Sequence, residues 1–459
     1  MVPTTESDPH STQPGEVAEL VARLRVGGTR ALAMTFVDNG GVTRVRVVPL
    51  QRLESVLRSG VGMSVAWAVA GTDDSFAVVA PFDSPTGDLR VFPDLTALQP
   101  QDGSSPLAWA PLEQYSQEQE PFVCCQRTVL RTAVERWRER GIEFKAAFEV
   151  EFALLDDEGA PAHRGPGYSA SAFLEIEPFA LALMEALASH GIDVEQFHVE
   201  HGPGQLEFSC APRDPLTAAD QLVLGRLLTR RVAAQHGFRV SFAPVPFPEA
   251  VGNGCHLHLS GWRDGVNLMR ADTPESAPTG DGAAMIAGIL AALPDLLAVI
   301  APSVPSYLRL QPHHWAGAYA CWGIENREAA VRLVPGTRSS RSSSANVEIK
   351  TVDGAANPYL AVGALLGAAL NGVERGASLP APVQCDPDTM TPTERHDAGV
   401  TRFSETLSDA IERLAKSDVA VAALGPELHQ AFLGVRRQEW ATFRDHDVAA
   451  LTAAYRWRY

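Results

Sequence analysis

Two glutamates, Glu149 and Glu151, occupy alternate positions in the run Phe148-Glu149-Val150-Glu151-Phe152. A β-strand sends alternate side chains to the same face, so both carboxylates point one way and the apolar side chains point the other. Like charges on a partly buried face repel each other and lose hydration unless a cation or a basic partner neutralises them. A single Glu-x-Glu pair more often lies on a solvated face, so a site is predicted only if further ligands recur downstream.

Further acidic and imidazole groups do recur, in short segments with the same alternation. Glu200 and Glu207 flank a Gly-Pro-Gly turn, which folds the chain back and lets the two carboxylates converge. His256 and His258 share one face of a predicted strand that follows a glycine-rich segment, and Glu348 lies in another alternating run. Each group alone is more often structural. Together, five glutamates and a histidine in alternating strands predict a carboxylate-rich site for two cations and phosphate groups.

Three arginines, Arg309, Arg327 and Arg332, follow in a region without runs of acidic residues. A guanidinium presents a planar fork of donors that matches carboxylate and phosphate oxygens. Surface arginines are common, so the cluster indicates a binding site only in combination with the acidic groups. The combination predicts a site that holds a carboxylic acid or a phosphate group next to the cations.

The composition narrows the class of protein. The chain has 459 residues, 45% hydrophobic and 20% charged, which is enough for a large core and two domains. Its net charge of −17 argues against nucleic acid or an anionic membrane as partner, and no stretch is expected to approach the roughly 20 apolar residues of a membrane span. Six cysteines without a CxxC pair favour reduced thiols. Residues 1–16 lack the features of a signal peptide and are predicted to be a disordered leader on a cytoplasmic protein.

The N-terminal part is predicted to be a small mixed domain over residues 17–120. Asp38-Asn39-Gly40-Gly41 is a hairpin turn signal between two apolar runs. The stretch 93–121, rich in Pro, Gln and Ser and without periodicity, is predicted to be a boundary or an ordered wrapping segment. The predicted elements are a helix at 17–28 and strands at 31–37, 42–48, 75–80 and 87–91.

The remainder, residues 121–459, is predicted to be a large catalytic domain of an α+β protein. Helices and strands alternate from an amphipathic helix at 128–140 to residue 260. A long apolar helix at 282–300 is expected to bend or break at Pro294, because proline removes a helical hydrogen bond. A loop-rich basic region at 302–350 and a mostly helical last third complete the chain.

Over nearly its whole length the chain resembles the glutamine synthetases. Four motifs occur in the order of that family: Glu-x-Glu-Phe at 149–152, Gly-x-Gly-Gln-x-Glu at 202–207, Gly-x-His-x-His-x-Ser at 254–260 and Asp-Gly-Ala-Ala-Asn-Pro-Tyr at 353–359. The resemblance implies a small β-grasp-like N-terminal domain followed by a large glutamine synthetase-type catalytic α/β domain. It also implies homo-oligomeric rings, as in a dodecamer, with each site at a subunit interface.

Position by position, the resemblance implies a site for ATP and two or more Mg²⁺ (or Mn²⁺) ions. One cation would be held by Glu151, Glu200 and Glu207, and the other by Glu149, His256 and Glu348. The implied nucleotide-side residues are His258, Ser260, Glu195, Asn346 and Arg332; those near the acid and the transferring phosphate are Gly252, Arg309 and Arg327; and Asp38 matches an aspartate of the ammonium pocket.

Several positions depart from the family pattern. Trp315 stands where glutamine synthetases have a flap glutamate that helps to deprotonate ammonium. An indole takes up no proton but offers an apolar wall to an organic amine, and the second acidic position of the ammonium pocket falls near Ser64. On the acid side, Val251 replaces an asparagine, and Lys350 replaces an arginine and so lacks its bidentate fork. Asn346 likewise replaces an arginine near the phosphates.

These departures favour a particular ligase, one that joins glutamate through its γ-carboxylate to a polyamine or monoamine. In the implied reaction a carboxylate attacks the γ-phosphate of ATP, and an amine then displaces phosphate from the acyl phosphate. A ligase for another carboxylic acid is an alternative, because Val251 and Lys350 belong to the acid pocket. Ordinary glutamine synthetase and a non-catalytic nucleotide- and metal-binding sensor stay open as further alternatives.

Overall fold

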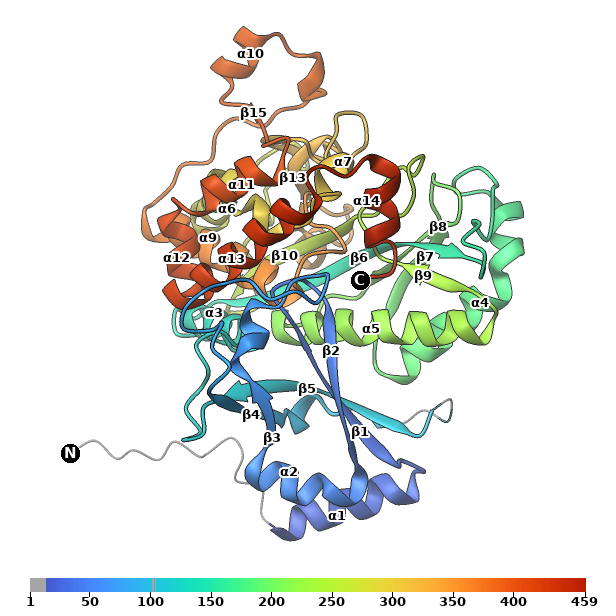
Figure 1. Cartoon of the computed structure of the whole chain (residues 1–459). Helices are drawn as coiled ribbons and strands as arrows, with labels where there is room; N and C mark the ends of the chain where they lie inside the picture. The colour runs from blue at the N-terminus through green and yellow to red at the C-terminus, as the bar shows by residue number, and fades with distance from the viewer. Residues whose placement is uncertain (1–13, 101–102, 104) are drawn as a thin grey trace, which may run out of the picture.

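The computed structural model describes residues 14–100, 103 and 105–459, and two β-sheets organise them (Figure 1). The small N-terminal sheet has the strand order β2-β1-β5-β4-β3, with β1 and β5 parallel and the other neighbours antiparallel. Two helices, α1 and α2, pack against it and share its apolar core. The bounds are α1 (Pro14–Val26), α2 (Leu53–Ser59), β1 (Ala31–Val37), β2 (Thr43–Pro49), β3 (Val61–Ser64), β4 (Asp88–Pro93) and β5 (Leu107–Tyr115).

The N-terminal domain corrects three expectations. Strand β5 lies inside the stretch 93–121 that was expected to be a boundary or wrapping segment, and it is a central strand. All but its first residue are buried, so its sequence lacks the alternation of a half-exposed strand. Residues 75–80 form no strand beyond an isolated bridge at Phe76. The predicted leader 1–16 lies outside the described residues except for its last three, which begin α1.

The large sheet has the strand order β15-β12-β13-β14-β10-β6-β8-β7, with β11 beside β10 and β9 beside β6. Three of its strands fall in the region 302–350, which was expected to be loop-rich. The bounds are β6 (Glu143–Leu155), β7 (Val194–Val199), β8 (Gln205–Cys210), β9 (Arg239–Ser241), β10 (Cys255–Arg263), β11 (Val266–Asn267), β12 (Tyr319–Ile324), β13 (Ala329–Val334), β14 (Asn346–Ile349) and β15 (Thr401–Arg402).

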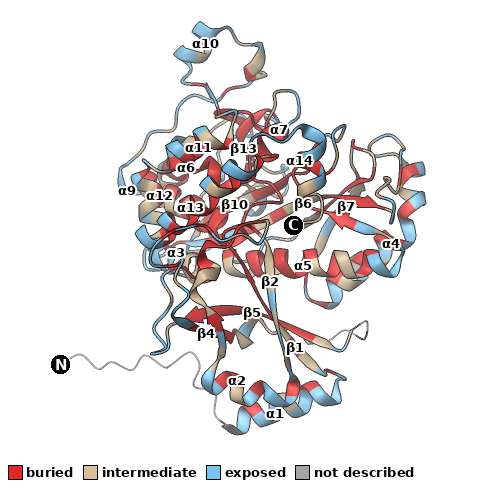
Figure 2. Ribbon diagram, viewed as in Figure 1, coloured by how far each residue is buried: buried red, intermediate tan, exposed pale blue. Residues whose placement is uncertain are grey.

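Helices pack around this sheet, and the buried ones share a single extended core with it (Figure 2). The segment between α9 and β15 carries α10 away from the body of the molecule (Figure 1). The bounds are α3 (Gln126–Arg138), α4 (Ala170–Ser189), α5 (Pro215–Gln235), α6 (Gly280–Ile300), α7 (Ser306–Arg309), α8 (Arg341–Ser344), α9 (Pro358–Glu374), α10 (Pro392–Asp397), α11 (Leu407–Leu414), α12 (Asp418–Leu424), α13 (Pro426–Phe443) and α14 (Val448–Tyr455).

Helix α6 bears on two expectations. It continues through Pro294, so it is not broken there, and a bend at this proline stays a prediction. The helix has 21 residues, and the mean hydropathy of its most apolar 18-residue window is 2.2, so by length and composition alone it could cross a membrane, contrary to the expectation that no stretch would approach such a span. However, 72% of its most apolar window is buried inside the protein, where it packs on α9. This is the burial expected of a core helix.

The two sheets are joined by buried polar contacts. The Asn357 side chain donates to the Val37 carbonyl at 2.9 Å, and Arg436 donates to the Asn39 carbonyl at 2.8 Å. Gly41, in the β1–β2 turn, lies so close to α9's leading segment that a Cβ would come within 2.1 Å of the Ala355 oxygen. The hairpin tip is therefore pressed onto the large domain. The boundary between residues 120 and 121 stays a prediction.

Candidate active site

The acidic strand is β6, at the middle of the large sheet. Glu149 lies directly opposite His256 of β10, and Glu151 lies directly opposite Glu207 of β8. Val150, between the two glutamates, is buried on the other face, as the alternation predicts. The strand register therefore brings two glutamates of β6 and one ligand from each neighbouring strand to one face.

The same row of side chains continues onto the strands on either side of these three. His258 lies opposite Glu348 of β14, which in turn lies opposite Arg332 of β13. On the other side, His198 of β7 lies opposite Glu207. Six strands thus contribute one continuous band of carboxylates, imidazoles and a guanidinium.

Three groups within this band bring potential ligand atoms within 4.8 Å of one another. His256 Nδ1 lies 3.2 Å from Glu149 and 3.3 Å from Glu348, and His258 Nε2 lies 3.1 Å from Glu149. At the other end, His198 Nε2 lies 2.9 Å from Glu200 and 3.5 Å from Glu207. The three groups are Glu149, Glu207 and His256; Glu149, His258 and Glu348; and His198, Glu200 and Glu207.

These groups overlap the two implied metal sets without reproducing either. His258 joins Glu149 and Glu348, and His198 takes the place that the resemblance gives to Glu151. Glu151 belongs to none of the three groups, although its Oε1 lies 3.6 Å from His256 Nε2; its Oε2 accepts from the Gly254 N–H at 2.9 Å. The Gln205 amide also donates to this carboxylate, at 2.8 Å.

Glycine is required at position 254. A Cβ there would come within 2.5 Å of the His256 Nε2 atom, 2.7 Å of an Arg309 nitrogen and 2.9 Å of a Glu151 oxygen. Any larger residue would displace the groups around the cluster. The glycine-rich entry to β10 therefore lets the backbone pass close to the ligands.

The electrostatics of the cluster favour a cation. Burial, together with the charges of Glu149, Glu151 and Glu200, raises the pKa of Glu207 well above its usual value. Although burial opposes ionisation of Glu149, hydrogen bonds from His256 and His258 hold its pKa well below the usual range. Carboxylate oxygens are the ligands that Mg²⁺ and Mn²⁺ prefer, and an imidazole nitrogen can complete such a set. The residues present therefore fit divalent ions.

Basic groups line the Glu348 side of the band. Lys350 Nζ donates to Glu348 at 2.9 Å, and Arg332 donates to the same carboxylate at 3.0 Å. Burial opposes ionisation of Glu348, but Lys350 and the two histidines hold its pKa well below the usual range. Arg309 is buried and donates to His256 Nε2 at 3.1 Å and to the Lys350 carbonyl at 2.9 Å. Lys350 and Arg309 are thus tied to the cluster itself.

The predicted nucleotide-side residues lie at different places on the large sheet. Asn346 Oδ1 accepts from His258 Nδ1 at 2.8 Å, so it orients that ring. Ser260 lies two residues further along β10 on the same face, where its hydroxyl accepts from the Trp262 indole at 2.9 Å. Glu195 is exposed on β7, at a shift of register between Val194 and Gln196 that interrupts the strand alternation. The first three lie along one end of the band, and the role of Glu195 stays a prediction.

Aromatic side chains border the band at Glu200. The Tyr168 hydroxyl donates to Glu200 at 3.0 Å, and its ring stacks on His198 with centroids 4.7 Å apart. His201 meets the Trp315 ring edge to face at 5.9 Å, and the Arg327 guanidinium lies 5.7 Å from the same indole. Trp315 and Arg327, both predicted site residues, are therefore brought together beside the cluster.

Tyr168, His198 and His201 were not predicted as site residues. His198 alternates with Glu200 in the sequence, so strand periodicity could have placed it on the same face. Tyr168 comes from the loop before α4 and has a positive φ of 59°. Its position depends on a tertiary fold of that loop, for which the sequence carries no periodic signal.

Other predicted positions lie elsewhere. Asp38 is fully buried in the β1–β2 hairpin, where Arg44 donates to it at 2.6 Å, and burial raises its pKa to about 6. Ser64 caps the turn after β3 by accepting from Ala66 N–H. Val251 is 40% exposed, next to the buried Gly252, whose φ of 108° and close approach to Arg309 require glycine. Within one chain, then, Asp38 and Ser64 belong to the N-terminal domain rather than to the band.

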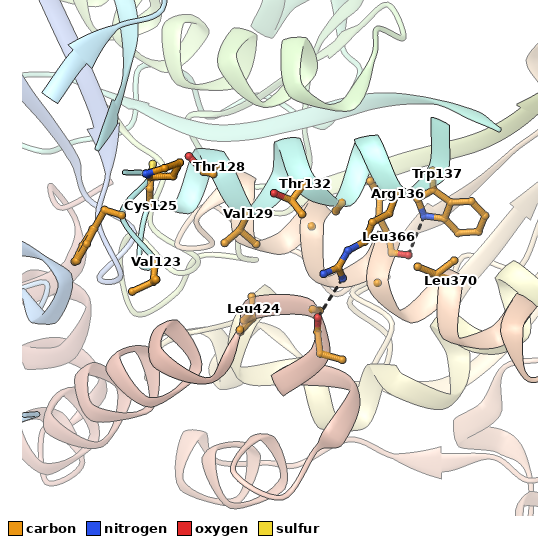
Figure 3. Close-up of a pocket in the computed structure, with 18 residues that line it drawn as sticks. Val123, Cys125, Thr128, Val129, Thr132, Arg136, Trp137, Leu366, Leu370 and Leu424 are labelled. Carbon is orange, nitrogen blue, oxygen red and sulfur yellow. Dashed lines mark hydrogen bonds between the residues drawn. The ribbon is translucent and has the colours of Figure 1, made fainter. Parts of the chain in front are cut away.

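A separate cavity of about 310 Å³ lies between α3, α9 and the end of α12 (Figure 3). Its walls are mainly apolar, and Trp137 Nε1 donates to the Leu366 carbonyl at 3.1 Å along one side. None of the described residues that line it belongs to the band or to the predicted site. The chemistry of the cluster therefore does not extend to this cavity.

Comparison with known proteins shows which proteins the chain is similar to. The family profile "Glutamine synthetase, catalytic domain" matches residues 123–452. The chain is 42% identical to "Gamma-glutamylpolyamine synthetase GlnA3" of Streptomyces coelicolor, over 99% of this chain and 100% of that protein. It is 31% identical to the glutamine synthetase of Mycolicibacterium smegmatis, over 91% and 94%.

Solved structures agree with the sequence comparisons. A structure described as a novel glutamine synthase homolog is similar with a TM-score of 0.84 and 35% identity, covering 94% of this chain and 99% of the other. The GmaS/ADP complex is similar with a TM-score of 0.81 and 27% identity, covering 93% and 97%. The α+β architecture, with a small sheet domain before a large catalytic domain, is confirmed.

Proposed function

Because the chain belongs to the glutamine synthetase family, we propose that it is an ATP-dependent carboxylate–amine ligase that joins glutamate, through its γ-carboxylate, to an organic amine. The observation that carries the choice of amine is the position of Trp315. Its indole borders the carboxylate cluster through His201 and Arg327, at the place where an ammonium-using relative has a flap glutamate. Polyamines are the first candidates, since the 42% identical relative is named for them.

The band supports phosphoryl transfer. Enzymes of this family use ATP and divalent metal ions, and two or more Mg²⁺ (or Mn²⁺) ions would be held by glutamates and histidines of the band. Such ions neutralise phosphate charge. On the protein side, Arg332 and Lys350 supply fixed positive charge next to Glu348. These groups would orient the phosphate and the acid so that a carboxylate can attack the γ-phosphate of ATP, which forms an acyl phosphate and releases ADP.

The aromatic border supports an amine with a carbon chain. Tyr168, His201 and Trp315 offer ring faces and edges within reach of Glu200. An alkylammonium group is attracted both to the carboxylate and to the face of an indole, and its methylene groups gain by leaving water. Bare ammonium gains nothing from the apolar part of this border.

The proposed assembly is a homo-oligomeric ring, with the dodecamer as the expected form, in the cytoplasm. Asp38 is buried within its own hairpin, so its part in an amine pocket would depend on a neighbouring subunit. Native mass spectrometry of the purified protein measures the subunit number directly. A monodisperse monomer would contradict the ring.

Phosphate release from ATP, measured with Mg²⁺, glutamate and a panel of amines, tests the function. The panel contains ammonium, ethanolamine, putrescine, spermine and an aromatic amine. We expect release to depend on glutamate and to be faster with an organic amine than with ammonium. Equal release with ammonium alone would point to ordinary glutamine synthetase, and indifference to glutamate would point to another acid. Tight ATP binding without turnover for any pair would point to a sensor.

One observation favours a carboxylic acid other than glutamate as the substrate. Lys350 is tied to Glu348 rather than free in a pocket, and Val251 offers a hydrocarbon surface where a hydrogen-bonding side chain would hold glutamate. Replacing glutamate by aspartate, 2-oxoglutarate or a simple aliphatic acid in the same assay separates the two possibilities. A higher kcat/KM with an acid lacking the α-amino group would favour the competing acid.

A further inference from the structure

The loop 311–318, which carries Trp315, has an unusual backbone. His313 and Trp315 have φ values of 64° and 51°, and Gly317 has 72°. A left-handed conformation is uncommon for residues with a side chain and persists only where the surroundings hold it. Trp315 is 48% exposed, so burial of its ring does not fix the loop. The loop must therefore be fixed by specific contacts to its backbone and to the His313 side chain.

The first contact is made by Glu328, immediately before β13. Its side chain is largely buried, and its carboxylate accepts from the Trp315 backbone N–H at 3.3 Å. The His313 backbone is a second hydrogen-bonding neighbour of the same carboxylate. One carboxylate therefore lies beside both left-handed residues, His313 and Trp315, on the inner side of the loop. Arg327, the neighbour of Glu328, faces the Trp315 ring.

The second contact comes from the extension between α9 and β15. The His313 ring lies between two carboxylates, with Nδ1 3.1 Å from Asp386 and Nε2 3.1 Å from Asp388. Asp388 is itself fixed, because it accepts from the Tyr319 hydroxyl and lies 3.9 Å from Arg395. The outer side of the loop is thus tied to the projecting segment.

The base of that segment is also joined to the loop. Arg402 donates to the Gln311 side chain at 3.1 Å, and β15 pairs with β12 directly after the loop. The loop is therefore held between β13 on the inside and the extension on the outside. Exposed ion pairs contribute little singly, but here several act on the same eight-residue segment.

We propose that Glu328 and His313 are positioning residues that hold Trp315 against the amine side of the cluster and so determine the preference for organic amines over ammonium. This inference rests on the proposed function for its substrate class. Neither residue needs to touch the reacting atoms. Glu328 acts through the backbone of Trp315, and His313 connects the same loop to a segment more than seventy residues further along the chain.

Steady-state kinetics in a double-mutant design test the proposal. We expect Glu328→Ala to raise KM for the preferred organic amine roughly 3- to 10-fold, because the indole loses its fixed position, with a smaller change in kcat. Glu328→Gln keeps an acceptor oxygen and should recover most of the loss. In a Trp315→Ala background, Glu328→Ala should add little, since the group being positioned is gone. An equal increase in both backgrounds would overturn the proposal.

The extension is tested with a matched pair of histidines. His313→Ala should raise the same KM, by about 2- to 5-fold, since it removes the weaker, exposed anchor. His396→Ala changes the same residue type on the same extension, but His396 is exposed and contacts its neighbour Asp397. It should leave KM at the wild-type value. A shift equal to that of His313→Ala would overturn the assignment of the anchor.

Hydrogen–deuterium exchange of the peptide covering 311–318 separates this inference from the proposed function. The measurement needs no substrate, so it remains decisive if the wild-type protein proves not to use organic amines. We expect faster exchange in this peptide for Glu328→Ala and His313→Ala and no change for His396→Ala. Unchanged exchange in both anchor variants would overturn the anchoring, whatever the amine panel shows.

Discussion

The metal-ligand band and the Trp315 loop are neighbours, but they are built in different ways. The band lies on six hydrogen-bonded strands, where the pairing of β6 with β8 and β10 fixes which side chains are neighbours. The loop has no ladder and is held by one buried carboxylate and a few surface ion pairs. Groups that handle phosphate thus occupy the rigid region, and the proposed amine wall occupies the adjustable one.

This difference indicates which region determines the phosphate chemistry and which determines the choice of amine. Neutralising phosphate charge requires ligands fixed to within a fraction of an ångström, which interior strands provide. Selecting an amine requires only a surface of suitable shape and polarity, which a loop can supply. The comparison predicts that changes in the band abolish the reaction, whereas changes in the loop redirect it.

The largest effect is expected for Glu151→Ala. Its carboxylate accepts from Gly254 N–H and faces Glu207, so its loss removes negative charge from the centre of the band. Phosphate release with ATP, glutamate and amine should fall by at least about 10³-fold. Glu143→Ala, at the exposed start of the same strand, serves as the matched control and should retain activity. Near-normal turnover of Glu151→Ala would refute the assignment of Glu151 as a cation ligand.

A smaller effect is expected on thermal stability when Mg²⁺ binds. Mg²⁺ at about 100 times its dissociation constant should stabilise the folded state by about 2.7 kcal/mol, seen as a rise in Tm that EDTA reverses. Glu207→Gln should abolish most of this rise. Because burial and three neighbouring carboxylates raise the pKa of Glu207, its neutral form is favoured, and glutamine mimics that form. Without Mg²⁺ the variant should therefore be at least as stable as the wild type.

A lower Tm for metal-free Glu207→Gln would contradict this account of the cluster. Retention of the full Mg²⁺ response would show that Glu207 is not a ligand. Thermal unfolding followed by differential scanning calorimetry, with and without Mg²⁺, gives both answers from one protein preparation.

The smallest effect is expected at Trp315, and it should concern selectivity. Trp315→Ala should raise KM for the organic amine about 3- to 10-fold and leave the ATP-dependent step largely intact, since the band is untouched. Trp315→Phe keeps an aromatic ring, so its KM for the organic amine should lie between those of the wild type and Trp315→Ala. Trp315→Glu should increase the residual activity with ammonium. An unchanged ratio of amine to ammonium activity in all three variants would remove Trp315 from the amine pocket.

The sequence was sufficient for the acidic strand β6. Glu149 and Glu151 alternate with buried apolar residues, so their common face followed from the period of a strand. The resemblance added the neighbours, and the observed register brings Glu207, His256 and Glu348 to that face. The sorting of ligands between the two implied cations stays a prediction.

Other parts could not be derived from local patterns. β5 lies in the middle of its sheet and is buried on both faces, so it shows no alternation and was mistaken for a linking segment. The place of Tyr168 and the contacts of His313 depend on residues far away in the chain, such as Glu200 and Asp386. Periodicity carries no information about such long-range contacts.

Strand register at β6 also has a consequence for how this enzyme could change over evolutionary time. A single inserted or deleted residue before Glu149 would turn both carboxylates toward the apolar core and move Phe148 and Val150 to the site. The catalytic centre therefore tolerates almost no change in length. The eight residues around Trp315 face no such restriction, so new amine substrates could be acquired there one substitution at a time, while the phosphate chemistry is inherited unaltered.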